Sequence, residues 1–272
     1  MCLFFYITEG ERLMQDFLME LLVYLIAGLG AGIGTGLSGL SAASVISPML
    51  ITFLGFDSYM AVGIALASDV LASGVSAYTY GKNDNLDIKN GKVMLVTVLI
   101  FTILGSYIGS HIPQNTMGSF SLIMTTILGI KFIFKPVMTT KEVNAQKEPW
   151  VKVLQSIFCG VVIGFICGFI GAGGGIMMLL ILTSVLGYEL KTAVGTSVFI
   201  MTFTAFVGAS SHFALSETPV KGSALFFCVL FTFIFAQIAA KFANKAAPEK
   251  LNRVTGFVLT ALGILMFIVK GL

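Results

Sequence analysis

Long apolar stretches alternate with short polar links along almost the whole chain. They cover residues 17–54, 61–81, 93–112, 117–134, 153–186, 193–214, 223–240 and 254–270. A helix needs about 20 apolar residues to cross the hydrocarbon core of a bilayer, so six of these stretches each predict one membrane-spanning helix. The pattern therefore predicts an all-α polytopic membrane protein.

The two longest stretches, 17–54 and 153–186, are too long for one crossing and rather short for two. Each is interrupted, the first by GLSGLSAAS at 36–44 and the second by GFIGAGGG at 168–175. The apolar piece after each interruption has about a dozen residues, which at about 1.5 Å per residue falls short of a bilayer core of about 30 Å. We therefore predict two broken helical hairpins whose tips lie inside the membrane.

The chain also repeats itself. At a shift of 132 residues, LGFDSYMAVG (54–63) falls on LGYELKTAVG (186–195), and glycines coincide in pairs that begin with Gly28 on Gly160. We predict two inverted repeats, each a broken hairpin plus about three membrane helices. The expected division is an N-terminal segment, a first repeat, a cytoplasmic linker and a second repeat, over 1–16, 17–135, 136–152 and 153–272.

Composition and charge exclude several classes of function. Apolar residues make up 57% of the 272 residues and charged residues 11%, whereas soluble domains have roughly 25% charged residues. The net charge of +3 is spread over the links and does not indicate nucleic-acid binding. The four cysteines form no CxxC pair, and no histidine and acid cluster has metal-ligand spacing. We therefore expect no enzyme, no cofactor and no metal.

Lysine and arginine prefer the cytoplasmic side of a membrane. The inverted arrangement places 13 of these residues on one side and three on the other, namely Arg12, Lys221 and Lys270. A parallel arrangement of four crossings per half gives 11 against five. The inverted arrangement fits better, with the linker in the cytoplasm and both termini outside.

The interruptions are the candidate binding site. A helix that begins inside the membrane has backbone N–H groups without partners, and these attract anions together with the helix dipole. Glycine would let a ligand approach this backbone closely. The predicted substrate-binding residues are Ser38, Ser41, Ser44, Gly171, Gly173, Gly174, Gly175, Thr196 and Ser197. The alternative is a packing kink without a ligand, and the glycines spaced by four before each break equally suit close helix packing.

The segment GFIGAGGGIMMLLILTSVLGYELKTAVGTS (168–197) resembles the glycine-rich signature of the TauE/SafE family of sulfite-exporter-like membrane proteins. The duplicated layout and the chain size are similar as well, so the resemblance covers nearly the whole chain. In the first half the glycine triplet reads Ser41-Ala42-Ala43, and AVGTS reads AVGIA. The resemblance implies transport of sulfur-containing oxyanions such as sulfite or organosulfonates.

Two titratable residues are candidates for coupling transport to protons. Asp69 is the one acid within 61–81, and a carboxylate inside a membrane is costly unless it has a function or partners. Its alternative role is a hydrogen bond to serines of a neighbouring helix. The matching position in the second half is Met201, so the repeat does not impose the acid. His212 lies near the end of its stretch, where an interfacial location is expected, and proton transfer is the alternative.

These observations predict a multi-pass transporter of the plasma (inner) membrane that exports small sulfur-containing oxyanions. The anion is expected at the helix N-termini of both hairpins near mid-membrane, with protons as a candidate coupling ion. The alternative is a membrane-embedded redox or assembly protein without transport activity. The sequence leaves the exact substrate, the direction and the oligomeric state open.

The charge division predicts how the chain is oriented. In a background without native cysteines, a cysteine replacing Ser216 should react with an impermeant thiol reagent added outside the cell, and one replacing Thr140 should not. Labelling of the Thr140→Cys variant from outside would overturn the predicted orientation.

Overall fold

The computed structural model describes residues 2–111, 149–170, 174–184, 190–216 and 218–247, with isolated positions between and after these ranges. Within them all regular structure is helical. The helices are α1 (Cys2–Ser38), α2 (Ala43–Leu54), α3 (Ser58–Gly81), α4 (Ile88–Gly109), α6 (Pro149–Ile170), α7 (Gly174–Ser184), α8 (Leu190–Leu215) and α9 (Gly222–Lys245). The predicted stretch 117–134, the linker 136–152 and the stretch 254–270 lie largely outside the described residues.

Helices long and apolar enough to cross a membrane confirm the predicted class. Five occur in the described part of the chain, at Met14–Ser38, Ser58–Gly81, Gly91–Gly109, Leu190–Leu215 and Gly222–Lys245. Large apolar side chains such as Phe206 and Phe226, each 62% exposed, cover the outside of the bundle. Polar side chains such as Ser68 and Thr204 are fully buried. This distribution is the one a lipid environment requires, because the apolar surface faces hydrocarbon and polar groups find partners within the protein.

Both predicted interruptions are present. Helix α1 ends at Ser38 and α2 begins at Ala43, while α6 ends at Ile170 and α7 begins at Gly174. The φ angle of Gly39 is +66°, in the left-handed region that terminates helices. The hydroxyl of Thr35 donates a hydrogen bond to the carbonyl of Leu40 at 2.8 Å. Helices α2 and α7, with 12 and 11 residues, are about 16–18 Å long.

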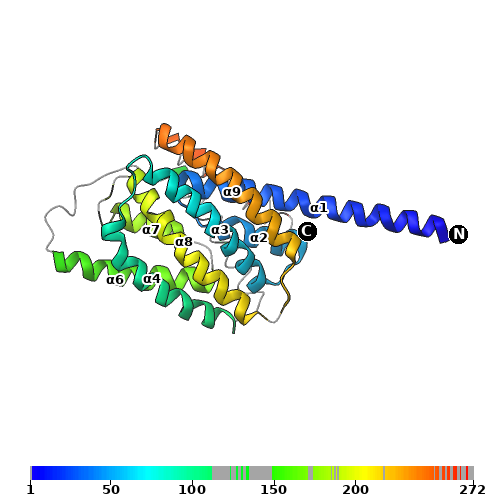
Figure 1. Ribbon diagram of the computed structural model, residues 1–272, viewed down its shortest axis with the longest axis horizontal. Helices are drawn as coiled ribbons and strands as arrows, with labels where there is room; N and C mark the ends of the chain where they lie inside the picture. Colours follow the sequence, from blue (N-terminus) through cyan, green and yellow to red (C-terminus); the bar gives the residue numbers. More distant parts are fainter. Residues whose placement is uncertain are drawn as a thin grey trace.

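The first helix is longer than the sequence indicated. It runs unbroken from Cys2 to Ser38 through the expected boundary at residue 16. At about 1.5 Å per residue it is about 55 Å long, which exceeds the thickness of a bilayer core. Its N-terminal end projects beyond the rest of the bundle (Figure 1).

The first helix of each half packs against a helix of the other half. Helix α1 of the first half packs along α9 of the second, and α6 of the second half packs along α4 of the first (Figure 1). Helices α3 and α8 contact each other between these pairs. If each helix is replaced by its counterpart in the other half, the α1–α9 pair becomes the α6–α4 pair, and the α3–α8 pair is unchanged. The pairing supports the predicted duplication, while the opposite membrane orientation of the halves stays a prediction.

Glycines make these contacts between the halves close. A Cβ atom built on Gly32 would lie 2.7 Å from the Cβ atom of Phe235 on α9, and one built on Gly164 would lie 2.9 Å from the Cβ atom of Phe101 on α4. The other four glycines of the two rows, Gly28, Gly36, Gly160 and Gly168, approach the same partner helices. The packing interpretation of these glycines is confirmed.

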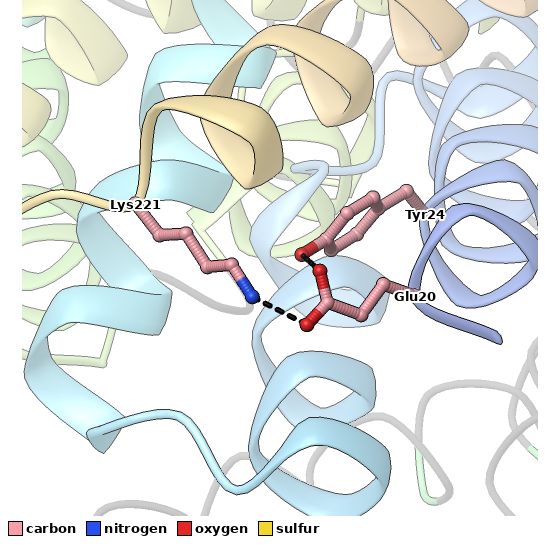
Figure 2. Close-up of polar contacts among 3 residues, drawn as sticks. All are labelled: Glu20, Tyr24 and Lys221. Atoms are coloured by element: carbon pink, nitrogen blue, oxygen red, sulfur yellow. Dashed lines mark hydrogen bonds and ion pairs between the residues drawn. The ribbon is translucent and has the colours of Figure 1, made fainter. Parts of the chain in front are cut away.

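A polar cluster joins α1 to the beginning of α9. The Lys221 ammonium contacts one carboxylate oxygen of Glu20, and the Tyr24 hydroxyl donates to the other at 3.3 Å (Figure 2). The same ammonium lies 5.9 Å from the centre of the Phe56 ring, in the link between α2 and α3. Three segments distant in sequence therefore meet at this end of the bundle.

The close approach of α1 and α9 makes a testable prediction about Gly36. An alanine Cβ atom there would lie 2.7 Å from the Cβ atom of Ala239 and against the backbone of Ala236. Overpacking of this kind costs about 1–3 kcal/mol, so Gly36→Ala should lower the melting temperature in detergent by several degrees. Gly222→Ala is the control, because among the described residues no atom outside its own helix turn lies within 4 Å of its Cβ position. Equal melting temperatures for the two variants would contradict the packing.

Candidate functional site

The two helix breaks meet inside the bundle. A Cβ atom built on Gly175, the second residue of α7, would lie 2.8 Å from the backbone nitrogen of Ser41 and against the carbonyl oxygen of Gly39. A Cβ atom built on Gly39 would lie 2.5 Å from the hydroxyl oxygen of Ser197 on α8. Residues of both breaks and of α8 are thus brought within contact distance. Gly171 and Gly173 lie outside the described residues.

The carboxylate of Asp69 lies at the N-terminus of α2. It accepts hydrogen bonds from the Ser73 hydroxyl at 2.9 Å, and from the Ser41 hydroxyl and the backbone N–H of Ala42, the N-cap residue of α2. The side chain is 1% exposed. A helix N-terminus favours a negative charge through its dipole and its unpaired N–H groups. The protein therefore supplies its own anion at the first break.

The remaining groups at this helix start are also paired locally. The N–H of Ala43 donates to the Ser41 hydroxyl oxygen at 3.3 Å, and the N–H of Ser44 donates to the Ser41 carbonyl at 3.0 Å. Ser38 and Ser44 are buried beside the break. The first half thus satisfies its break with protein groups, as backbone inside a membrane requires.

The second break differs from the first at the matching position. Met201 stands on α8 where Asp69 stands on α3, and its Sδ atom lies 2.7 Å from the Cβ position of Gly175. A thioether is neutral, so this side chain places no charge at the N-terminus of α7. At this matching position, the first half therefore has a carboxyl side chain and the second half has an uncharged side chain.

The two hydroxyls predicted on α8 have different surroundings. Ser197 faces Gly39 at the first break and donates to the carbonyl of Val194 at 2.9 Å. Thr196 faces the link between α3 and α4, where its hydroxyl oxygen accepts a hydrogen bond from the N–H of Asp87 at 3.0 Å. The structure therefore brings Ser197 to the breaks and gives Thr196 a partner elsewhere.

A row of polar residues extends along α3 from Asp69. Ser73, Ser76 and Tyr80 follow at spacings of three or four residues, and all three are fully or almost fully buried. The Ser76 hydroxyl has no hydrogen-bond partner among the described residues. The Tyr80 hydroxyl donates to the carbonyl of Gly36 at 3.1 Å, at the end of α1. This row connects the first break with the far end of α3.

His212 forms a second buried polar cluster at the other end of α8. Its Nδ1 atom lies 2.8 Å from the Ser106 hydroxyl and 2.9 Å from the carbonyl of Gly208. Its ring stacks on Tyr59 with a centroid distance of 4.1 Å. A carbonyl can only accept, so Nδ1 carries the proton of the neutral ring and Nε2 is left as an acceptor. Nε2 has no partner within the described part of the chain.

The structure shows the surroundings of His212, while its expected interfacial depth stays a prediction. The residue lies in the last turn of α8, near the helix end as expected. However, its side chain is fully buried among α3, α4 and α8, because it packs on Tyr59 and Ser106. The tertiary structure thus places the ring inside the bundle, where a proton acceptor without a partner is unusual.

Sequence analysis missed a cation close to the first break. Lys191, from the first turn of α8, borders a cavity of about 10 Å³ together with Ser38 and Tyr80. Its ammonium donates to the carbonyl of Asn244 at 2.8 Å and forms no ion pair with a carboxylate of the described residues. The sequence feature that could have identified Lys191 is its position in LGYELKTAVG (186–195), shortly before the predicted site residues Thr196 and Ser197. The cavity is about the size of one water molecule.

Comparison with known proteins gives the family. The profile of the sulfite exporter TauE/SafE family matches residues 24–266. The chain is 26% identical to the probable membrane transporter protein MJ0441 of Methanocaldococcus jannaschii, over 93% of this chain and 97% of the relative. It is similar to the probable membrane transporter protein YunE of Bacillus subtilis, at 26% identity over 65% of this chain and 72% of the relative. YdhB of the same organism, with the same description, is 20% identical over 86% of this chain and 94% of the relative.

No solved structure matches the chain significantly. The family match covers both breaks, the paired halves and the central helices α3 and α8. This multi-pass membrane protein therefore belongs to the TauE/SafE family of membrane transporters.

Proposed function

We propose that this membrane transporter exports small sulfur-containing oxyanions, such as sulfite or organosulfonates, and that the anion binds where the two breaks meet. The observation that carries the proposal is the contact between the N-terminal turn of α7 at Gly175 and the first break at Gly39 and Ser41. A helix that begins there directs its N–H groups and its positive dipole end at the centre of the bundle. Such discontinuous helices hold substrates in many transporters.

The second break is the better candidate for the substrate. At the first break the Asp69 carboxylate accepts the N–H of Ala42 and the Ser41 hydroxyl. At the second break the matching residue is the uncharged Met201, so a substrate anion would complete the arrangement that Asp69 completes in the first half. Ser197 and Ser41 line the approach from the opposite side. Lys191, in the first turn of α8, would attract anions toward the first break.

Protons are the coupling ion of this proposal. Asp69 is buried between three hydrogen-bond donors, and a change in its charge would alter the field at the meeting point of the breaks. His212, at the other end of α8, offers its Nε2 acceptor, which has no partner among the described residues. The two residues would therefore take up and release protons at different depths of the bundle.

Replacement of Met201 tests where the substrate binds. Met201→Asp would place a carboxylate at the N-terminus of α7, as Asp69 is placed at α2, and should abolish uptake of labelled substrate into proteoliposomes. Asparagine is nearly the same size as aspartate but carries no charge, so the Met201→Asn variant should retain measurable flux. The panel is sulfite, thiosulfate, sulfoacetate and sulfate, with the melting temperature as the folding control.

Two outcomes would contradict the proposal at different levels. Absence of flux for every sulfur compound with the unmodified protein would reject the substrate class and favour the redox or assembly alternative. Equal flux through the Met201→Asp and Met201→Asn variants would reject the second break as the anion site while leaving transport itself intact.

Asp69→Asn tests proton coupling. The amide oxygen can still accept from Ala42 and Ser73, so the variant should fold, but it cannot exchange a proton. We expect loss of accumulation driven by a pH gradient, with exchange of labelled substrate at equilibrium retained. Unchanged accumulation with an unchanged pH dependence would assign Asp69 a purely structural role.

A further inference from the structure

A large groove lies between α3 and α8, away from the two breaks. Its volume is about 570 Å³, and its lining includes Gly74, Tyr78 and Lys82 from α3 and the loop after it, with Phe199 and Phe203 from α8. Tyr78 is 72% exposed and Phe203 is 44% exposed. Because both helices are long and apolar enough to span a bilayer, the groove opens toward lipid.

The inner part of the groove is apolar. Among the described residues, a Cβ atom on Gly74 would approach only Thr202, at an ordinary contact distance of 3.6 Å from its methyl carbon, so the missing side chain deepens the groove at this point. The Thr202 hydroxyl donates to the carbonyl of Val198 at 2.8 Å, within its own helix. The floor and walls therefore consist of hydrocarbon and aromatic surface, which suits an alkyl chain and not a solvated anion.

The outer end of the groove is cationic. Lys82 follows the last residue of α3, is exposed, and forms no ion pair with a carboxylate of the described residues. Tyr78 lies one turn earlier on the same face, and tyrosine is typical of the headgroup level of a membrane. Lys82 lies eight positions after Gly74, which corresponds to about 12 Å along the helix, most of one leaflet's hydrocarbon depth of about 15 Å.

The repeat provides an internal comparison. At the shift of 132 residues, Gly74 corresponds to Phe206, Tyr78 to Ser210 and Lys82 to Ala214. The matching face of the second half therefore has a large ring in place of the glycine and no cation. The groove is consequently not a by-product of the duplicated fold.

We propose that this groove binds one anionic phospholipid. Its phosphate pairs with Lys82 at the membrane surface, and one acyl chain runs over Gly74 between α3 and the two phenylalanines of α8. Charge complementarity selects the anionic headgroup, and the apolar lining accepts the chain. The site uses no residue of the proposed transport pathway, so it stands independently of the substrate.

Fluorescence quenching at the groove tests the proposal. The reporter is the full chain with Trp150→Phe and Phe203→Trp, which leaves one tryptophan at the edge of the groove. It is reconstituted into phosphatidylcholine vesicles containing either brominated phosphatidylglycerol or brominated phosphatidylcholine. We expect brominated phosphatidylglycerol to quench the tryptophan at several-fold lower mole fraction.

Three substitutions in this reporter separate the headgroup contact from the acyl contact. Lys82→Gln should reduce the preference for phosphatidylglycerol about five-fold, the effect of one lysine near an anionic surface. Lys92→Gln removes another exposed lysine outside the groove and should leave the preference unchanged. Gly74→Phe copies the residue of the second half and should reduce quenching by both lipids.

Each other result would overturn the proposal. Equal quenching by the two lipids would show that the groove does not select a negative headgroup. A preference that survives Lys82→Gln would place the headgroup elsewhere. Protection of the tryptophan from both lipids would show that a second copy of the chain covers this face. None of these readouts depends on transport, so they are distinguishable from failure of the proposed function.

Discussion

The requirement that every backbone polar group find a partner inside the membrane governs this structure. Two helices break within the bundle, and a break leaves N–H groups at the start of the next helix without partners in the chain. At α2 these groups are satisfied by Asp69, by the Ser41 hydroxyl and by the Ser41 carbonyl. At the end of α1, the Tyr80 hydroxyl donates a hydrogen bond to the carbonyl of Gly36. The polar centre of the bundle follows from these requirements.

Duplication provides two such breaks, and the chain completes them differently. Asp69 places a titratable carboxyl group at the first break, while Met201 leaves the matching place in the second half without a titratable group. Two otherwise similar helix starts thereby acquire different electrostatics. The proposed function assigns the substrate anion to the second break and the proton-responsive group to the first, and this difference is the physical basis of that assignment.

The packing of the first helix of each half against the other half explains how the breaks are held together. Helix α1 packs closely on α9 and α6 on α4 through glycines, so each broken hairpin is anchored to the opposite half. Close backbone approach stabilises helix pairs in a membrane, where the hydrophobic effect does not drive them together. If one half moved relative to the other, the two breaks would therefore shift relative to each other.

The sequence by itself determined the class, the two breaks, the duplication and the glycine rows, because hydrophobic length and residue spacing are local properties. It placed the interruptions within 36–44 and 168–175, and in the structure they lie between Ser38 and Ala43 and between Ile170 and Gly174. It also indicated Asp69, since a lone acid in an apolar stretch is conspicuous. It offered hydrogen bonds to serines as the alternative role of Asp69, and Ser41 and Ser73 provide them, but it did not identify these two serines or Ala42.

Only the tertiary structure decided the partners. Ala42 and Asp69 lie 27 positions apart, and Gly39 and Ser197 lie 158 apart, so no local pattern could show that they touch. Burial of His212 depends on Tyr59 and Ser106 from two other helices. Lys191 reaches the first break because α8 begins beside the end of α1. Contacts between distant helices are set by packing and by mutual satisfaction of polar groups, which the order of residues along one helix does not specify.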